Sequence, residues 1–121
     1  PNGANSYRLE LGNIVIVYCT DIEHPEKQLN QNVIDFAKNA DILINDAQFT
    51  DEELPAHIGW GHSSWQQSTA LAREANVKQL VLFHHNPYNN DDVIRQIEKD
   101  AQAVFRNTVA AREGQEITLS V

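Results

Sequence analysis

The chain has 121 residues, of which 41% are hydrophobic and 21% charged, with a formal net charge of −8. This length and composition predict one globular domain with a single core and exclude a disordered chain. No apolar run approaches the roughly 20 residues that cross a bilayer, and no signal-peptide pattern opens the chain, so we expect a cytoplasmic protein without a membrane segment. The acidic balance makes nucleic acid an unfavourable partner for this segment.

The sequence contains no methionine and opens on Pro1. We therefore expect it to be a piece of a longer protein. Cys19 is the only cysteine, so an internal disulfide is excluded and nothing indicates an oxidising compartment. Its place after an apolar run predicts a small core residue, although a thiolate ligand is a second interpretation.

Alternating apolar and polar side chains over residues 7–10, followed by Gly12 and an apolar run over residues 14–18, predict a β-hairpin with a second arm buried on both faces. From Pro25 the apolar residues recur at helical spacing as far as Ala40, which predicts a helix.

Ser63 and Ser64 each stand three residues before a glutamine, the spacing of a capping box, and this pattern predicts a helix start. The other predicted elements are a strand over 41–45, the capped helix to about Ala75, a strand over 80–83, a helix from Asn90 or Asp91, and short strands over 107–111 and 116–121. Alternating strands and helices indicate an α/β fold with parallel strand pairs.

Polar side chains follow three of the predicted strands, namely Asp21, Asp46 and His84, and His62 directly precedes the predicted helix start. The carboxyl ends of parallel strands meet at one edge of a sheet, so we expect these groups to converge. Aspartate and histidine suit a zinc-type site, but the chain has no H-E-x-x-H or C-x-x-C pattern. Spacing alone therefore leaves open a turn residue at Asp21 and a strand-capping histidine at His84.

For the remaining histidines we expect roles outside the site. His85 is expected to be structural or to support its neighbour, and His24 and His57 are expected to be solvated loop residues. Trp60 and Trp65 flank a turn and are expected to pack against the fold, with a pocket-lining role as the alternative.

Four ordered blocks, YCTDIEH (18–24), INDAQFT (44–50), GWGHSSW (59–65) and LFHHNP (82–87), resemble the C-terminal half of metallo-β-lactamase-fold metallohydrolases. The branch containing ribonuclease Z and cyclic-phosphate phosphodiesterases is the most similar. The resemblance implies half of a four-layer αββα sandwich, with a mixed sheet and helices on one face. It makes residues 1–121 the C-terminal part of one domain whose N-terminal half, with the family's H-x-H-x-D-H cluster, is absent from the chain.

The resemblance also implies roles. Asp21 matches a carboxylate that bridges two metal ions, and His84 matches a histidine metal ligand. His62 matches a histidine that donates a proton or stabilises charge, with Ser64 in place of the family's threonine. Apart from the resemblance, Asp46 has two interpretations: a group that orients His62, or the cap of a loop. Two divalent ions are implied, zinc foremost, with manganese or iron as alternatives.

The function implied is a metal-dependent phosphodiesterase acting on a small phosphodiester, with this segment inactive by itself. The alternative is a catalytically inactive domain that keeps the fold for binding or regulation. The resemblance further implies a partner, either the missing N-terminal half or a second copy of the chain, because an isolated half would expose an apolar sheet face.

Overall fold

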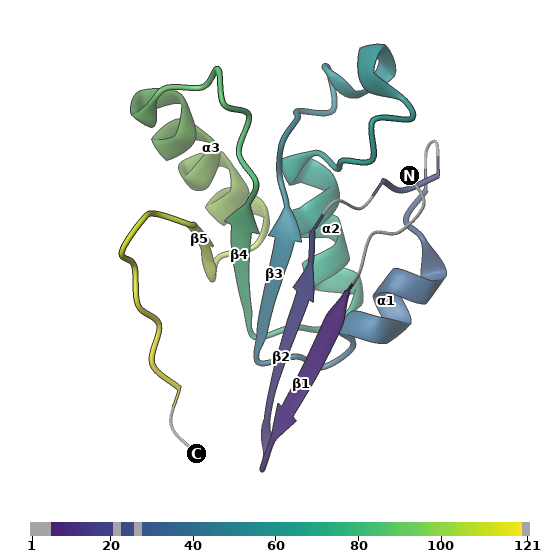
Figure 1. Cartoon of the computed structure of the whole chain (residues 1–121), viewed down its shortest axis with the longest axis vertical. Coiled ribbons are helices and arrows are strands. Elements are labelled where there is room, and N and C mark those ends of the chain that lie inside the picture. The colour runs from purple at the N-terminus through teal and green to yellow at the C-terminus, as the bar shows by residue number, and fades with distance from the viewer. Residues whose placement is uncertain (1–5, 21–22, 26–27, 120–121) are drawn as a thin grey trace.

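The structure is a computed structural model that describes residues 6–20, 23–25 and 28–119. Its five strands form one sheet in the order β1-β2-β3-β4-β5 (Figure 1). The elements are β1 (Tyr7–Leu11), β2 (Ile14–Cys19), α1 (Gln31–Ala37), β3 (Ile42–Asp46), a 3-10 turn η1 (Leu54–His57), α2 (Trp65–Glu74), β4 (Gln79–Phe83), α3 (Asp91–Val104) and β5 (Thr108–Ala110).

The sheet is mixed. The predicted hairpin is confirmed: β1 pairs antiparallel with β2 around Gly12, whose φ of 62° suits a residue without a Cβ. The pairs β2–β3, β3–β4 and β4–β5 are all parallel. The carboxyl ends of β2, β3 and β4 therefore lie side by side at one edge.

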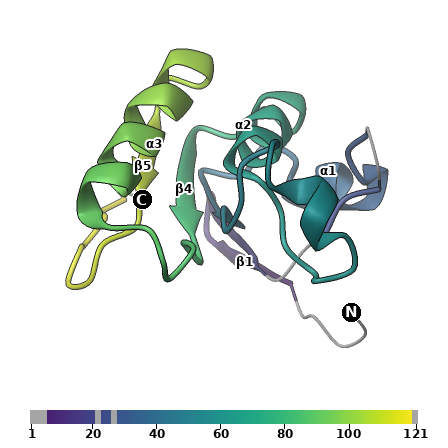
Figure 2. The same cartoon turned by 90° about the horizontal axis from the view of Figure 1, so that it is seen from above.

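All three helices cover the same face of this sheet (Figure 2). Ala37 of α1, Leu71 of α2 and Ile97 of α3 belong to one apolar cluster with strand residues such as Leu43 and Leu80. Leu43 and Leu80 are fully buried. This arrangement of a mixed sheet with helices on one face is the fold class that the sequence predicted.

The opposite face of the sheet has no covering layer among the described residues, and it is apolar. Because side chains alternate along a strand, the strand residues outside the helix-side cluster point toward this opposite face. Leu9 and Leu11 of β1 are 54% and 63% exposed. Tyr18 and Phe83 contact each other there, with ring centroids 6.0 Å apart. The prediction that the second hairpin arm is buried on both faces is therefore wrong for this part of the chain, because Ile16 and Tyr18 are only partly buried, whereas Val17 and Cys19 on the helix side are fully buried.

Two predicted elements differ from the structure. The first helix ends at Ala37 rather than Ala40, because Asn39 takes a left-handed conformation with φ of 61°. The predicted strand over residues 116–121 is wrong for residues 116–119, which form no strand; 120 and 121 lie outside the described residues. The edge strand β5 has three residues and pairs in parallel with β4.

No described helix is both long and apolar enough to cross a membrane.

His24 was expected to be solvated, and this expectation is wrong: it is 5% exposed. Its Nδ1 accepts a hydrogen bond of 3.0 Å from the Asn30 backbone N–H, which leaves the proton of the neutral ring on Nε2. Burial lowers the pKa of His24 from the ordinary 6.5 to about 4.

This pKa predicts a loss of stability in acid. The unfolded chain takes up a proton at His24 near pH 6.5, whereas the folded chain does so only near pH 4. The free energy of unfolding should therefore fall by roughly 3 kcal/mol as the pH drops through this window. In His24→Asn, whose Oδ1 can still accept from Asn30, that part of the slope should disappear. Urea unfolding at pH 4 to 7 measures it, and an identical slope in both proteins would contradict the assignment.

Candidate metal and catalytic centre

Asp46, His62 and His84 converge at the carboxyl edge of the sheet. Each offers one ligand atom, and these atoms all lie within 4.8 Å of one another. The structure thus brings together three of the four predicted site residues. The fourth, Asp21, follows β2 at the same edge but lies outside the described residues, so its placement stays a prediction.

Asp46 ends the central strand β3 and is fully buried. Its Oδ1 accepts hydrogen bonds from the backbone N–H groups of Gln48 at 3.1 Å and Ser63 at 3.4 Å. Burial raises the pKa of Asp46, and the hydrogen bond with His62 opposes that rise. The carboxyl group is therefore fixed in one orientation by contacts from two segments.

His62 lies 2.8 Å from Asp46, measured between Nδ1 and Oδ2, and its side chain is 16% exposed. An ionised carboxylate only accepts hydrogen bonds, so Nδ1 is the donor and Nε2 becomes the acceptor atom of the neutral ring. This contact fixes both the tautomer and the direction of Nε2. The Asp46–His62 pairing that the sequence suggested is present.

The start of α2 holds His62 in place. The predicted capping box is confirmed: Ser64 Oγ accepts from the Gln67 N–H, and the Gln67 side chain accepts from the Ser64 N–H, both at 3.0 Å. Below it, Ser68 accepts a hydrogen bond from buried Asn45 of β3 at 2.8 Å. The helix is thereby tied to the strand that carries Asp46.

His84 directly follows β4 and takes a left-handed conformation with φ of 57°. That conformation costs a residue with a Cβ about 1–2 kcal/mol, and histidine tolerates it better than branched residues. It turns the chain sharply at the sheet edge, where the ring centroids of His62 and His84 are 4.6 Å apart. Such local strain persists where the surroundings fix it and is common at functional sites.

Sequence reasoning missed one contact that joins two site loops. The Glu23 carboxylate accepts hydrogen bonds from the backbone N–H groups of Gly59, at 2.8 and 3.0 Å, and Gly61, at 3.0 Å. Both glycines have positive φ, 88° and 84°. Glu23 thus links the loop after β2 to the residue before His62. The Gly-x-Gly pattern signalled the turn, but no local pattern could name its distant partner.

Aromatic contacts extend from the site along the same loop. Phe49 stacks on His57 with ring centroids 4.3 Å apart and meets His62 edge-on at 6.1 Å. His57, expected in solvent, is thus a packing residue. Trp65 packs against the core, as expected, but Trp60 is 60% exposed, so packing describes it only in part.

Cys19 is fully buried in the core cluster, which confirms the interpretation as a core residue. His85 lies beside the centre, and neither of its ring nitrogens has a hydrogen-bond partner among the described residues. Burial lowers its pKa from the ordinary value.

A cavity of about 550 Å³ opens beside the centre. Its lining comes from the end of β4 and from the turn after β5: Phe83, His84, His85, Pro87, Ala111, Arg112 and Glu113. Arg112 is the basic residue of this lining, and its guanidinium pairs with Glu98 at 3.0 Å.

Comparison with known families gives a match to the Beta-lactamase superfamily domain over residues 2–85. Among curated proteins, ribonuclease Z of Archaeoglobus fulgidus is 39% identical over 81% of this chain and 30% of that protein. Ribonuclease Z of Thermoplasma volcanium is 35% identical over 88% of this chain and 33% of that protein. The chain spans about 30% of the length of the curated relatives it matches.

Two solved structures are similar. The metallo-β-lactamase fold protein YhfI from Bacillus subtilis has a TM-score of 0.73 and 25% identity, covering 91% of this chain and 42% of that one. Human tRNase Z, short form, has a TM-score of 0.68 and 16% identity, covering 96% of this chain and 38% of that one. At this identity the similarity supports the fold and nothing further. These matches cover most of the chain. The chain therefore belongs to the β-lactamase superfamily and has a ribonuclease Z-like metallo-β-lactamase fold.

Proposed function

We propose that this chain is the C-terminal part of a metal-dependent phosphodiesterase. The observation that carries the proposal is the convergence of Asp46, His62 and His84 at the sheet edge, within 4.8 Å of one another. The similarity to ribonuclease Z over most of the chain favours the same class of reaction. "Full-length protein" below means the longer protein of which we propose this chain to be part.

The donor set suits a zinc-type ion. Zinc readily accepts imidazole nitrogens and carboxylate oxygens as ligands, and manganese and iron also accept both. In our assignment His84 and Asp21 hold the ions, with Asp21 shared between two of them. When bound, such ions lower the pKa of a water molecule toward neutrality and stabilise the charge on the attacked phosphorus.

His62 and Asp46 act on the leaving group in this proposal. Asp46 accepts from Nδ1, so Nε2 is directed toward the edge shared with His84. A carboxylate beside the ring also stabilises its protonated form, from which Nε2 can donate a proton to the departing oxygen. Asp46 is then a positioning residue and His62 the group that touches the substrate.

The cavity beside His84 offers room for the substrate, at about 550 Å³. The Arg112 guanidinium in its lining suits a phosphodiester, because a planar cation binds phosphate oxygens well. Phe83 in the same lining offers an apolar surface to the rest of the molecule. We propose a small phosphodiester substrate on this basis.

The open face of the sheet implies a partner. Its β1 residues Tyr7, Leu9 and Leu11 are more than half exposed, and a contiguous apolar surface of this kind marks a contact face. We propose that the N-terminal half of the same domain covers it, with a second copy of the chain as the alternative.

An inactive binding domain remains the competing function, and Asp21→Ala in the full-length protein separates the two. If the chain is part of an enzyme, this variant should lose one or more equivalents of bound metal and nearly all turnover of bis(p-nitrophenyl) phosphate. Metal content by mass spectrometry and initial rates measure the two effects. Asp35→Ala is the control, because Asp35 lies on α1 and its carboxylate accepts a hydrogen bond from the exposed Gln31 side chain. Unchanged rates and metal content in Asp21→Ala would sink the catalytic proposal.

A further inference from the structure

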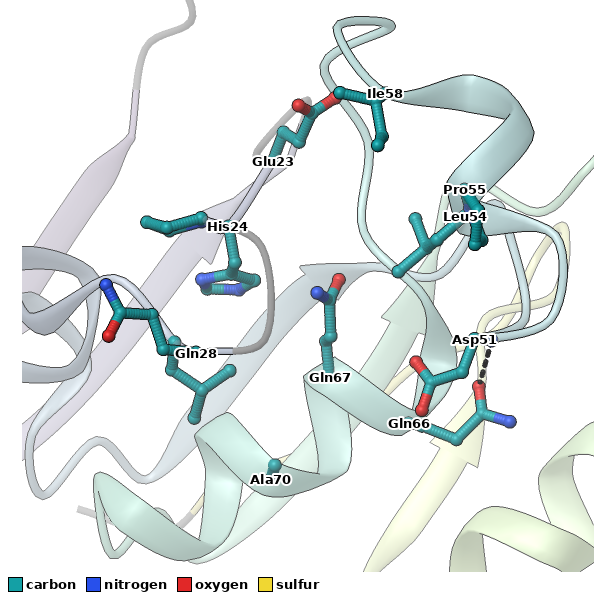
Figure 3. Close-up of a pocket in the computed structure, with 12 residues that line it drawn as sticks. Glu23, His24, Gln28, Asp51, Leu54, Pro55, Ile58, Gln66, Gln67 and Ala70 are labelled. Atoms are coloured by element: carbon teal, nitrogen blue, oxygen red, sulfur yellow. Dashed lines mark hydrogen bonds between the residues drawn. The ribbon is translucent and has the colours of Figure 1, made fainter.

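A second cavity of the described chain does not belong to the centre described above. It has a volume of about 580 Å³, within the range of small-molecule sites, and shares no lining residue with the Asp46–His62–His84 cluster. Figure 3 shows it between the loop that carries Glu23 and His24, the loop around Leu54 and Ile58, and the first turns of α2. We call it the α2 pocket.

The hydrogen-bond acceptors around the α2 pocket are already engaged. Both oxygens of Glu23 accept from Gly59, and one also accepts from Gly61. Asp51 accepts from the Ser64 hydroxyl. The Gln67 carbonyl oxygen accepts from the Ser64 N–H at 3.0 Å, which fixes the orientation of that amide. These oxygens are therefore already used within the protein.

The donors are not engaged. With its oxygen held by Ser64, Gln67 presents its NH2 group, and that group bonds to no described residue. His24 is 5% exposed, and its Nε2, which carries the proton, has no hydrogen-bond partner in the described part of the chain. Figure 3 shows the His24 ring and the Gln67 amide facing each other across the pocket. An unpaired donor buried in this way costs stability, which a ligand acceptor would recover.

The rest of the lining narrows the ligand class. Leu29, Leu54, Pro55 and Ile58 supply apolar surface. Glu23 and Asp51 are the charged groups of the lining and no cation accompanies them there, so an anion is repelled. A simple cation has no acceptor atom for the Gln67 NH2 group or for the His24 Nε2–H, so it would leave both donors unpaired.

From this arrangement we propose that the α2 pocket is a binding site for an uncharged small molecule that carries carbonyl or ring-nitrogen acceptors on a planar ring. Pyrimidine nucleosides represent this class. The site is separate from the proposed phosphodiesterase centre, and its occupation requires neither metal nor turnover.

The test is equilibrium dialysis of radiolabelled uridine against the full-length protein in EDTA. Uridine should bind with a Kd on the order of 0.1–1 mM, as expected for a ligand of its size. Uridine 5′-monophosphate should bind at least threefold more weakly, because its phosphate meets Glu23 and Asp51. Because EDTA removes the metal, uridine binding is measured without phosphodiesterase activity, so the result does not depend on whether the proposed hydrolase is correct.

Two variants address the pocket by different means. Gln67→Glu keeps an oxygen for the capping box but removes the NH2 donor, and Ala70→Leu fills the pocket while leaving every donor in place. Each should weaken uridine binding at least tenfold, with thermal unfolding as the check on folding. Gln115→Glu is the matched control: it makes the same change at an exposed turn, where the side-chain oxygen likewise accepts a backbone N–H. It should bind as the parent does.

Absence of uridine binding up to 10 mM, unchanged binding in either pocket variant, or tighter binding of the monophosphate would each overturn the proposal.

Discussion

Replacing His62 with alanine in the full-length protein should lower kcat for bis(p-nitrophenyl) phosphate by about 10²- to 10⁴-fold, the usual loss when a general acid is removed. Bound metal should stay at the parent level, because we assign His62 to the leaving group. The physical reason is the fixed geometry of the ring: Asp46 holds Nδ1 at 2.8 Å, so Nε2 is delivered to the edge where His84 lies.

Measuring bound metal distinguishes a proton donor from a metal ligand at position 62. His62 also belongs to the three-residue cluster whose geometry would suit an ion. If His62→Ala loses metal together with activity, His62 is a ligand and our assignment of the proton donor is wrong. His84→Ala, by contrast, should lose metal. His57→Ala is the control, because this nearby ring stacks on Phe49 and lies outside the cluster.

Asp46→Asn should reveal the positioning role. The amide can still contact His62 but does not stabilise its protonated form, so kcat should fall and the alkaline limb of the pH–rate profile, where the proton donor is lost, should shift to lower pH, while KM changes little. A purely structural role for Asp46 would change stability without moving that limb.

The second large effect concerns the open face of the sheet. Ile44 lies at the centre of this face, on β3 between Tyr18 and Val81 in the ladder. In the 121-residue chain by itself, Ile44→Asp should suppress self-association, because it places a charge on an otherwise apolar surface. In the full-length protein the same change should destabilise the fold by several kcal/mol, because the carboxylate would be buried without a partner.

The proposal therefore expects Ile44→Asp to improve the behaviour of the isolated chain, by suppressing its self-association, and to lower the stability of the full-length protein. Solution scattering measures the mass of the chain, and urea unfolding measures the stability of the full-length protein. Val93→Asp is the control, since Val93 is 41% exposed on α3 and away from this face. If the unsubstituted chain is a monodisperse monomer of 13.7 kDa, or if Ile44→Asp leaves full-length stability unchanged, the proposed covering half is wrong.

Several features could be predicted from the sequence because their causes are local. The capping box at Ser64 and Gln67, the hairpin at Gly12 and the apolar strand that leads to His84 each depend on neighbouring residues. Parallel pairing then required the ends of β3 and β4 to meet, which is why Asp46 and His84 could be expected at one edge. The role of Asp21 rests on resemblance alone.

Other features follow from contacts across the sequence that no local pattern contains. The Glu23 contacts with Gly59 and Gly61 span 36 and 38 residues. The burial of His24 depends on the loops and on α2, which close around it only in the folded chain.

The amino-acid sequence by itself therefore determined the order of the elements and the polar groups at the strand ends, because propensity, capping and periodicity act over a few residues. Tertiary structure decided which of these groups meet: it paired Asp46 with His62, set His84 in a strained turn beside them, and converted a loop histidine into the buried wall of a separate pocket. Distances between side chains depend on packing of the whole sheet and its helices, and that packing is a property of the folded chain.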